Sequence, residues 1–274
     1  MIEVAVEELV HVYPNRVRAV DGVSLRIGPG ESVGLIGQNG SGKTTLARHL
    51  NGLLRPTAGR VVVGGVDAAG QRVAGLSAQV GLVFQDPDRQ IFSGSVRDEV
   101  AFGPRNLGQR GAELAAAVAE AMEAVGLKDE EATNPQDLGA ARRRLLGLAS
   151  VLAMRTPVLV LDEPTTGQDR RGVARVRSVI ESARVAGRTV ITISHDLRFV
   201  AETCERVVVM RAGRVVLDDT PGRAFAAAHR QTLRSTGLEP PAAAIIGERQ
   251  GLRDVATEAG LIAALAGAGG GPVA

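Results

Sequence analysis

The first feature with the residue types and spacing of a chemical site is a glycine-rich run that ends in a lysine and a threonine. The run comprises Gly37, Gln38, Asn39, Gly40, Ser41, Gly42, Lys43 and Thr44 and matches the pattern G-x-x-x-x-G-K-[ST]. Glycines let backbone N–H groups turn inward around phosphate oxygens because no Cβ obstructs them. The lysine can reach the β- and γ-phosphates of a nucleotide, and the threonine hydroxyl can bind Mg²⁺. The run therefore predicts a site for ATP and Mg²⁺ that includes Thr45. The alternative is a chance glycine turn.

Two acidic residues, Asp162 and Glu163, come directly after the apolar run 158–161. An apolar run of this length is typical of a buried strand, and α/β sheets place their ligands at the carboxyl ends of such strands. Asp162 is predicted to hold Mg²⁺, directly or through water. Glu163 is predicted to polarise the attacking water as a general base. The alternative is a pair of acids that only cap the next loop.

The elements around these residues alternate between strand and helix. Residues 1–36 are predicted to form short β segments, of which the last runs into the glycine loop, and a helix follows the loop. The region from about 87 to 156 is predicted to be a helical subdomain inserted between two strands, with Gly126 ending one of its helices. This alternation predicts a parallel, doubly wound α/β sheet with right-handed crossovers. Further strands are predicted at 59–67, 80–85, 157–164 and 189–195, helices at 111–127, 141–154 and 173–187, and a hairpin at 205–220.

Composition limits the possible partners and compartments. Aromatic residues make up 2% of the 274 residues, so the core must be aliphatic, which suits a parallel sheet covered by helices. The formal net charge is +2 and no long basic run occurs, so we expect no nucleic-acid partner. Cys204 is the only cysteine, which rules out an internal disulfide and fits a reducing cytosol. The N-terminus lacks the basic start of a signal peptide, and no apolar run reaches the roughly 20 residues of a membrane span. Any role at a membrane must therefore come through a partner.

Four further residues follow the order of functional residues in a known family. Together with the glycine loop and the acidic pair, Tyr13, Gln85, Asp169 and His195 make the chain resemble the ATP-binding cassette (ABC) ATPases over roughly residues 3–225. The resemblance implies an ABC ATPase domain at 1–225, built from a parallel-sheet core, an N-terminal antiparallel β subdomain and the helical insertion. Residues 226–274 would form a C-terminal extension, and we expect its tip to be disordered.

The same resemblance implies a role for each of these residues. Gln85 would be the Q-loop glutamine, which senses Mg²⁺ and the γ-phosphate and couples to a transport subunit. Asp169 would lie in the D-loop, His195 would be the switch histidine that contacts the γ-phosphate, and Tyr13 would stack on adenine. The alternatives are a plain polar loop residue for Gln85, a satisfied histidine at a strand end for His195 and an ordinary core residue for Tyr13.

A narrower resemblance points to one branch of the family. Segments 88–92 and 100–104 and the tail segment 237–252 are similar to the cobalt/nickel and energy-coupling factor branch. This implies an importer for a vitamin or a transition-metal ion, with the chain held peripherally at the cytoplasmic face of the cell membrane. Its membrane partners would be a transmembrane coupling subunit and a substrate-binding subunit.

The chain departs from the family at the signature segment, which is normally close to Leu-Ser-Gly-Gly-Gln. The corresponding residues are Leu138, Gly139, Ala140, Ala141 and Arg142. The serine hydroxyl that would bind the γ-phosphate is missing, and two glycines have gained a Cβ where a backbone must approach a phosphate closely. Two cassettes of the family close head to tail, with each ATP between one phosphate loop and the other chain's signature. We therefore expect a heterodimer with a second cassette that has an intact signature. The alternative is a working homodimer that tolerates the substitutions.

Two other functional classes compete with the importer motor. A soluble ABC protein acting on nucleic acid or ribosomes usually has two cassettes in one chain, a long coiled-coil insertion or basic arms, and none of these is present in the sequence. A non-hydrolysing regulatory subunit is favoured by the altered signature, but Glu163 and His195 argue against it.

Overall fold

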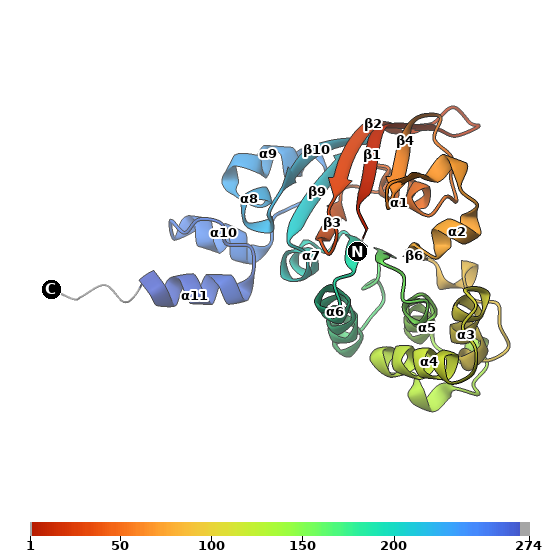
Figure 1. The fold of residues 1–274 in the computed structure, drawn as a ribbon. Helices are drawn as coiled ribbons and strands as arrows, with labels where there is room; N and C mark the ends of the chain where they lie inside the picture. Colours follow the sequence, from red (N-terminus) through yellow and green to blue (C-terminus); the bar gives the residue numbers. More distant parts are fainter. Residues whose placement is uncertain (1, 269–274) are drawn as a thin grey trace.

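The computed structural model describes residues 2–268 and contains two β-sheets with helices packed around them (Figure 1). The larger sheet has six strands in the order β10-β9-β3-β8-β7-β6. Every neighbouring pair is parallel except β10 with β9, which form the antiparallel hairpin predicted from the sequence. The fold is therefore the predicted α/β class with a parallel-sheet core. The strands are β3 (Ser32–Ile36), β6 (Val80–Val83), β7 (Val158–Asp162), β8 (Thr189–Ile193), β9 (Arg206–Arg211) and β10 (Arg214–Asp219).

The smaller sheet is antiparallel and has the order β2-β1-β4-β5. Its strands are β1 (Val4–Val12), β2 (Arg18–Ile27), β4 (Ala58–Val63) and β5 (Val66–Asp67). The prediction of one strand over 59–67 was wrong, because this segment forms two strands. Gly64 and Gly65, with φ of 59° and 81°, make the turn between them. Two successive residues with positive φ are what a tight two-residue hairpin requires, and glycine adopts them without strain.

Helix α1 (Lys43–Leu50) lies between the two sheets. Its Leu46 and Leu50 belong to a buried cluster that also contains residues of β1, β2 and β4 and one face of the six-stranded sheet. Because side chains alternate along a strand, β7 places Val158 and Val160 in this cluster and Leu159 and Leu161 in the cluster on the opposite face. The apolar run before Asp162 is thus buried on both sides, which fixes the position of the acids that follow it.

The inserted subdomain contains α3 (Val96–Asn106), α4 (Gly111–Val125) and α5 (Ala140–Ala153), which form a group below the sheets in Figure 1. Helix α4 ends at Gly126, which has a φ of 70°, as predicted. Helix α3 was not predicted because Gly103 and Pro104 disfavour a helix interior. Pro104 is tolerated near the helix end, since α3 stops two residues later. Helix α6 (Arg170–Val185) packs against α4 and the large sheet in the same buried cluster.

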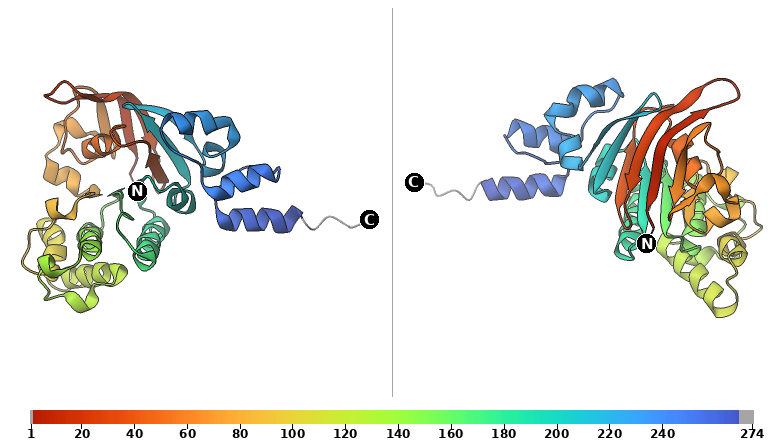
Figure 2. Two further views of the ribbon diagram at one scale, coloured as in Figure 1. Left: turned by 180° about the vertical axis from the view of Figure 1, so that it is seen from behind. Right: turned by 45° about the horizontal axis from the view of Figure 1, so that its top comes forward.

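The remaining helices lie on both faces of the large sheet. They are α2 (Val73–Ser77), beside β6, and α7 (Leu197–Thr203), α8 (Pro221–Ala224), α9 (Arg230–Ser235), α10 (Ala242–Arg249) and α11 (Glu258–Ala268) in the C-terminal part. Phe225, Leu233 and Leu238 pack with residues of α7 and β9, so the start of the extension is attached to the sheet. Figures 1 and 2 show α10 and α11 extending away from α3, α4 and α5. The tip of the extension, which we expect to be disordered, includes residues 269–274, and these lie outside the described residues.

None of the helices within residues 2–268 combines the length and the apolar character needed to span a bilayer.

Candidate functional site

The glycine loop, the acidic pair and the end of the small sheet enclose one cleft of about 470 Å³. The loop connects β3 to α1, and the acids follow β7, so the parallel strands bring both to the same edge of the sheet. The cleft is lined by Tyr13, Val17, Arg18, Ala19, Asn39, Gly40, Gly42, Lys43, Thr44, Thr45, Gln85, Asp162, Glu163 and Ile193.

The backbone of the loop is fixed by two close approaches that only glycine permits. A Cβ on Gly37 would lie 2.2 Å from the carbonyl oxygen of Met210, and one on Gly42 would lie 2.3 Å from the carbonyl oxygen of Ala19. Gly42 also has a φ of 104°, which L side chains rarely adopt. Gly40, at a φ of 80°, faces open space at the exposed tip of the loop. The loop is therefore pinned at both ends and open where a ligand would approach.

The Lys43 ammonium lies inside the loop. Its Nζ donates hydrogen bonds to the carbonyl oxygens of Gly37, at 2.7 Å, and Gln38, at 2.9 Å. Burial lowers the pKa of Lys43, and the nearby negative charges of Glu163 and Asp162 act in the opposite direction. A buried cation held this way is available to an anionic ligand at the mouth of the loop.

The Thr44 hydroxyl and Asp162 form the pair of oxygen groups that the sequence assigned to Mg²⁺. Thr44 Oγ1 donates to Asp162 Oδ2 at 2.8 Å, whereas the buried Asp162 Oδ1 has no hydrogen-bond partner. Burial raises the pKa of Asp162, while the hydrogen bond from Thr44 lowers it. A hydroxyl beside a carboxylate with an unused oxygen fits Mg²⁺, which protein sites usually bind through one or two carboxylates together with substrate phosphates. Within residues 2–268 there is no cluster of three or more histidine, cysteine or acidic side chains that could hold a metal without such phosphates.

Glu163 lines the cleft and is in direct contact with His195, which is not itself among the lining residues. His195 Nδ1 lies 2.7 Å from Glu163 Oε2, and the Thr166 hydroxyl donates to the same oxygen at 3.4 Å. Glu163 has a φ of 53°, in the left-handed region that non-glycine residues rarely occupy, and its N–H donates to the carbonyl oxygen of Ile193 at 2.8 Å. Such a conformation persists only where surrounding contacts enforce it, and here it directs a buried carboxylate into the cleft.

Tyr13 and Gln85 also line the cleft, at positions contributed by the two sheets. The Tyr13 hydroxyl lies 3.1 Å from Thr45 Oγ1, and the half-buried tyrosine belongs to the cleft wall rather than to the interior. Gln85 follows β6, and its carbonyl oxygen accepts a long hydrogen bond of 3.5 Å from Arg144 Nε. Gly37 and Ser41 lie behind the lining, where Ser41 is buried.

The signature segment and Asp169 are not part of this cleft. Helix α5 begins at Ala140, and its N-cap Gly139 makes no side-chain capping hydrogen bond. Arg142 forms an ion pair with Glu130. Asp169 accepts a hydrogen bond from the Gly172 N–H at 2.7 Å and so caps α6. The D-loop and the signature are nevertheless in contact, because Gln168 Nε2 donates to the carbonyl oxygen of Ala141 at 2.8 Å.

Four cleft residues were missed by the sequence reasoning, namely Val17, Arg18 and Ala19 around the start of β2 and Ile193 at the end of β8. Arg18 is paired with Asp21 at 2.6 Å. No motif marks these residues, since they reach the cleft only through strand pairing, of β2 with β1 and of β8 with β3.

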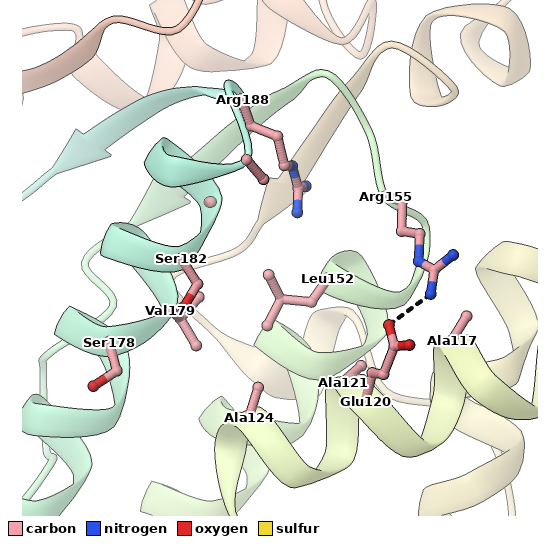
Figure 3. A pocket seen from close by; sticks show the side chains of 12 residues that line it. Ala117, Glu120, Ala121, Ala124, Leu152, Arg155, Ser178, Val179, Ser182 and Arg188 are labelled. Atoms are coloured by element: carbon pink, nitrogen blue, oxygen red, sulfur yellow. Dashed lines mark hydrogen bonds and ion pairs between the residues drawn. The ribbon is translucent and has the colours of Figure 1, made fainter.

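A second, mostly apolar pocket of about 250 Å³ lies between α4, α5 and α6 and contains none of the residues predicted for a site (Figure 3). Small and aliphatic side chains such as Ala121, Leu152 and Val179 line it. Arg155 and Glu120 form an ion pair of 2.6 Å at its edge. A crevice thus lies between the helical subdomain and α6, beside the buried contacts that join them.

Comparison with known proteins agrees with the geometry of the cleft. The sequence profile of the ABC transporter family matches residues 20–166. The energy-coupling factor transporter ATP-binding protein EcfA2 of Symbiobacterium thermophilum is 42% identical to the chain over 253 residues, covering 89% of the chain and 86% of the relative. The chain belongs to the ABC transporter family of ATP-binding proteins.

Other members of the family are similar along most of this ABC cassette. The cobalt import ATP-binding protein CbiO of Rhodobacter capsulatus is 39% identical, with 86% of the chain and 85% of the relative covered. The solved structure of cbiO1 from Clostridium perfringens, described as part of the ABC transporter complex cbiONQ, has a TM-score of 0.73 and 33% identity over 89% of the chain and 98% of that structure. The chain spans only 43% and 38% of the length of two further relatives, ABC transporter ATP-binding proteins of Caldanaerobacter subterraneus and Methanosarcina acetivorans.

Proposed function

We propose that the chain hydrolyses ATP and thereby energises a membrane importer of the energy-coupling factor type. The observation that carries this proposal is the single cleft in which Lys43, the Thr44–Asp162 pair and Glu163 converge, with His195 in contact with Glu163. This set contains a cation for phosphate oxygens, oxygen ligands for Mg²⁺ and a carboxylate for water activation, which are the parts that phosphoryl transfer to water requires.

Each residue has a defined step in the proposed hydrolysis. Lys43 and the N–H groups of the loop bind the β- and γ-phosphates, while Thr44 and Asp162 would hold Mg²⁺, which neutralises phosphate charge when bound. Glu163 accepts a proton from the attacking water, whose oxygen bonds to the γ-phosphorus as the bond to the bridging oxygen of ADP breaks. His195, whose side chain is 66% exposed, holds Glu163 and can reach the γ-phosphate from the open side.

We further propose that the working unit is a heterodimer with a second cassette. The segment Leu138–Arg142 lies outside this chain's own cleft, so it would serve the nucleotide of the partner. Gly139 lacks a hydroxyl, and Ala140 and Ala141 place methyl groups where the family has glycine. A homodimer would have two weakened sites, whereas a partner with an intact signature would complete this chain's cleft fully.

The printed names of the relatives support an importer and suggest its cargo. They include energy-coupling factor ATP-binding proteins and a cobalt import ATP-binding protein, so we propose a vitamin or a transition-metal ion as the cargo class. The chain would bind peripherally at the cytoplasmic face of the membrane to a transmembrane coupling subunit, alongside a substrate-binding membrane subunit. Residues 1–225 would form the ATPase domain and 226–274 the extension.

An exposed aromatic pair offers a docking surface for the coupling subunit. Phe92, which is 64% exposed, and Phe102, which is 45% exposed, contact each other edge to face with ring centroids 4.6 Å apart. Phe92 lies in the segment between Gln85 and α3, and Phe102 lies in α3 itself. Exposed aromatic side chains of this kind are enriched at protein interfaces.

The test is purification from detergent-extracted membranes followed by ATPase assays on the complex. We expect a second cassette and membrane subunits to copurify, and Glu163→Gln to reduce the ATPase rate about 100-fold or more. The altered signature favours a second candidate, a non-hydrolysing regulatory subunit. That candidate predicts an unchanged rate in Glu163→Gln, and this result would overturn the proposed hydrolysis.

A further inference from the structure

Two buried histidines lie directly behind the end of the cleft that Tyr13 lines. His49 belongs to α1 and is 1% exposed, and His11 belongs to β1 and is 8% exposed. Neither side chain lines the cleft. Neither histidine takes part in a chemical step of the proposed hydrolysis. Their burial beside the cleft therefore indicates a different role.

The hydrogen bonds of the pair determine which ring nitrogens carry protons. His49 Nδ1 lies 2.7 Å from the carbonyl oxygen of Thr45, so this nitrogen donates and Nε2 of the neutral ring accepts. His49 Nε2 lies 3.1 Å from His11 Nδ1, which is also 3.1 Å from the carbonyl oxygen of Arg55. His11 Nδ1 therefore carries a proton and faces both acceptors. Burial lowers the pKa of His49, which agrees with a neutral ring.

Tyr13 is held by contacts that both lead to α1. The His11 ring stands edge-on to Tyr13, with centroids 4.6 Å apart and an interplanar angle of 82°. The same His11 ring stands edge-on to His49, at 4.7 Å and 74°. The Tyr13 hydroxyl lies 3.1 Å from Thr45 Oγ1 on α1. The ring and the hydroxyl of Tyr13 are thus both tied to the helix that begins at Lys43.

We propose that His11 and His49 are positioning residues that set the Tyr13 ring at a fixed place relative to the phosphate loop. The base of a bound nucleotide then meets an aromatic face that is already in position, so little ordering is needed on binding. This inference rests on the proposed function, because it takes the ligand to be a nucleotide with its phosphates at Lys43. It predicts that the pair contributes to binding of the base and not to binding of the phosphates.

The experiment compares two ligands that differ in the base. MgATP carries adenosine, and magnesium tripolyphosphate has the phosphate chain alone. Tyr13 is the only tyrosine and the chain has no tryptophan, so the intrinsic tyrosine fluorescence of the folded protein reports on this ring. In the wild type we expect MgATP to change the fluorescence and magnesium tripolyphosphate to bind without changing it.

The variants separate positioning from general structure. His11→Leu fills the buried position with an apolar side chain but removes the aromatic ring. We expect the affinity for MgATP to fall about 3- to 10-fold, as loss of an aromatic pair does. The affinity for magnesium tripolyphosphate should stay unchanged. His11→Phe retains a ring and should recover most of the MgATP affinity. His229→Leu, a matched change in the C-terminal part, should leave both affinities unchanged.

A double-mutant cycle completes the test, with binding measured by calorimetry. In a Tyr13→Ala background, His11→Leu should cause no further loss of MgATP affinity, because its effect passes through Tyr13. The proposal would be overturned if His11→Leu lost equal affinity for both ligands or lost affinity for neither. It would also be overturned if His11→Leu still lowered the MgATP affinity in the Tyr13→Ala background. His49→Leu gives the same comparison from the α1 side if His11→Leu does not fold. Failure of the wild type to bind either ligand would instead refute the proposed function.

Discussion

The phosphate loop and the signature segment are both glycine-containing turns that begin a helix, but their surroundings differ. Gly42, which precedes α1, has a φ of 104°, and its Cα approaches the backbone of β2. Gly139, which precedes α5, has a φ of −61°, and a Cβ built on it would meet nothing within 4 Å. This chain's own structure therefore dictates glycine in the loop, whereas it leaves room for a side chain at Gly139.

The two helices also differ in how firmly they are attached. Helix α1 is enclosed between both sheets and carries the buried Lys43 and His49. Helix α5 begins at the surface, with Arg142 in an ion pair with Glu130, and near its other end it borders the crevice beside α6 (Figure 3). We infer that the nucleotide cleft is preorganised by its enclosure, whereas the signature lies at the exposed start of its helix.

The strongest test of this difference is a pair of glycine substitutions. Gly42→Ala should abolish binding of MgATP to this chain, a loss of more than about 100-fold in affinity, because the new methyl group collides with the Ala19 carbonyl and displaces the loop. Gly139→Ala should leave this chain's own affinity unchanged. Calorimetric titration of both variants measures the effect. Equal losses in the two variants would mean that the loop is not the more constrained turn.

A smaller effect is expected from restoring the family signature. Combining Gly139→Ser, Ala140→Gly and Ala141→Gly returns a hydroxyl and two unobstructed backbone groups to the start of α5. The ATPase rate of the assembled complex should rise about 100-fold, since one preorganised donor to developing charge commonly contributes about 100- to 1,000-fold. An unchanged rate, measured against the complex with the original signature, would show that the segment already supports full turnover.

The smallest effect concerns stability and pH. Burial lowers the pKa of His49 below its unfolded value of about 6.5, so the unfolded chain binds a proton more readily than the folded chain. The stability of the folded state should be fully present above pH 6.5 and decrease as the pH falls below it. Among the residues that the structure describes, His11 is the one titratable ring in contact with His49. Denaturant titrations at several pH values should show that the free energy of unfolding depends less on pH in His49→Gln than in the wild type. An identical pH dependence in the two proteins would exclude His49 as its source.

The sequence predicted the cleft well because its main parts are local. The residues of the loop are consecutive, and Asp162 and Glu163 follow an apolar run whose burial on both faces could be inferred from its composition. The α/β fold and the hairpin of β9 and β10 also follow from local patterns.

The features that the sequence did not predict depend on contacts between distant segments. Arg18 reaches the cleft through strand pairing, and His11 meets His49 only because β1 packs against α1. Helix α3 forms despite Gly103 and Pro104 because its Val96 and Val100 are buried in the subdomain core. Tertiary packing outweighs local preference at such positions.

The measurement that tests the central claim most directly is equilibrium binding of MgATP to the purified chain, followed by tyrosine fluorescence and calorimetry. We predict saturable binding that requires Mg²⁺ and is lost in Lys43→Ala, while the thermal stability without ligand is largely retained. Absence of saturable binding, or binding that survives Lys43→Ala unchanged, would contradict the assignment of the cleft as the nucleotide site.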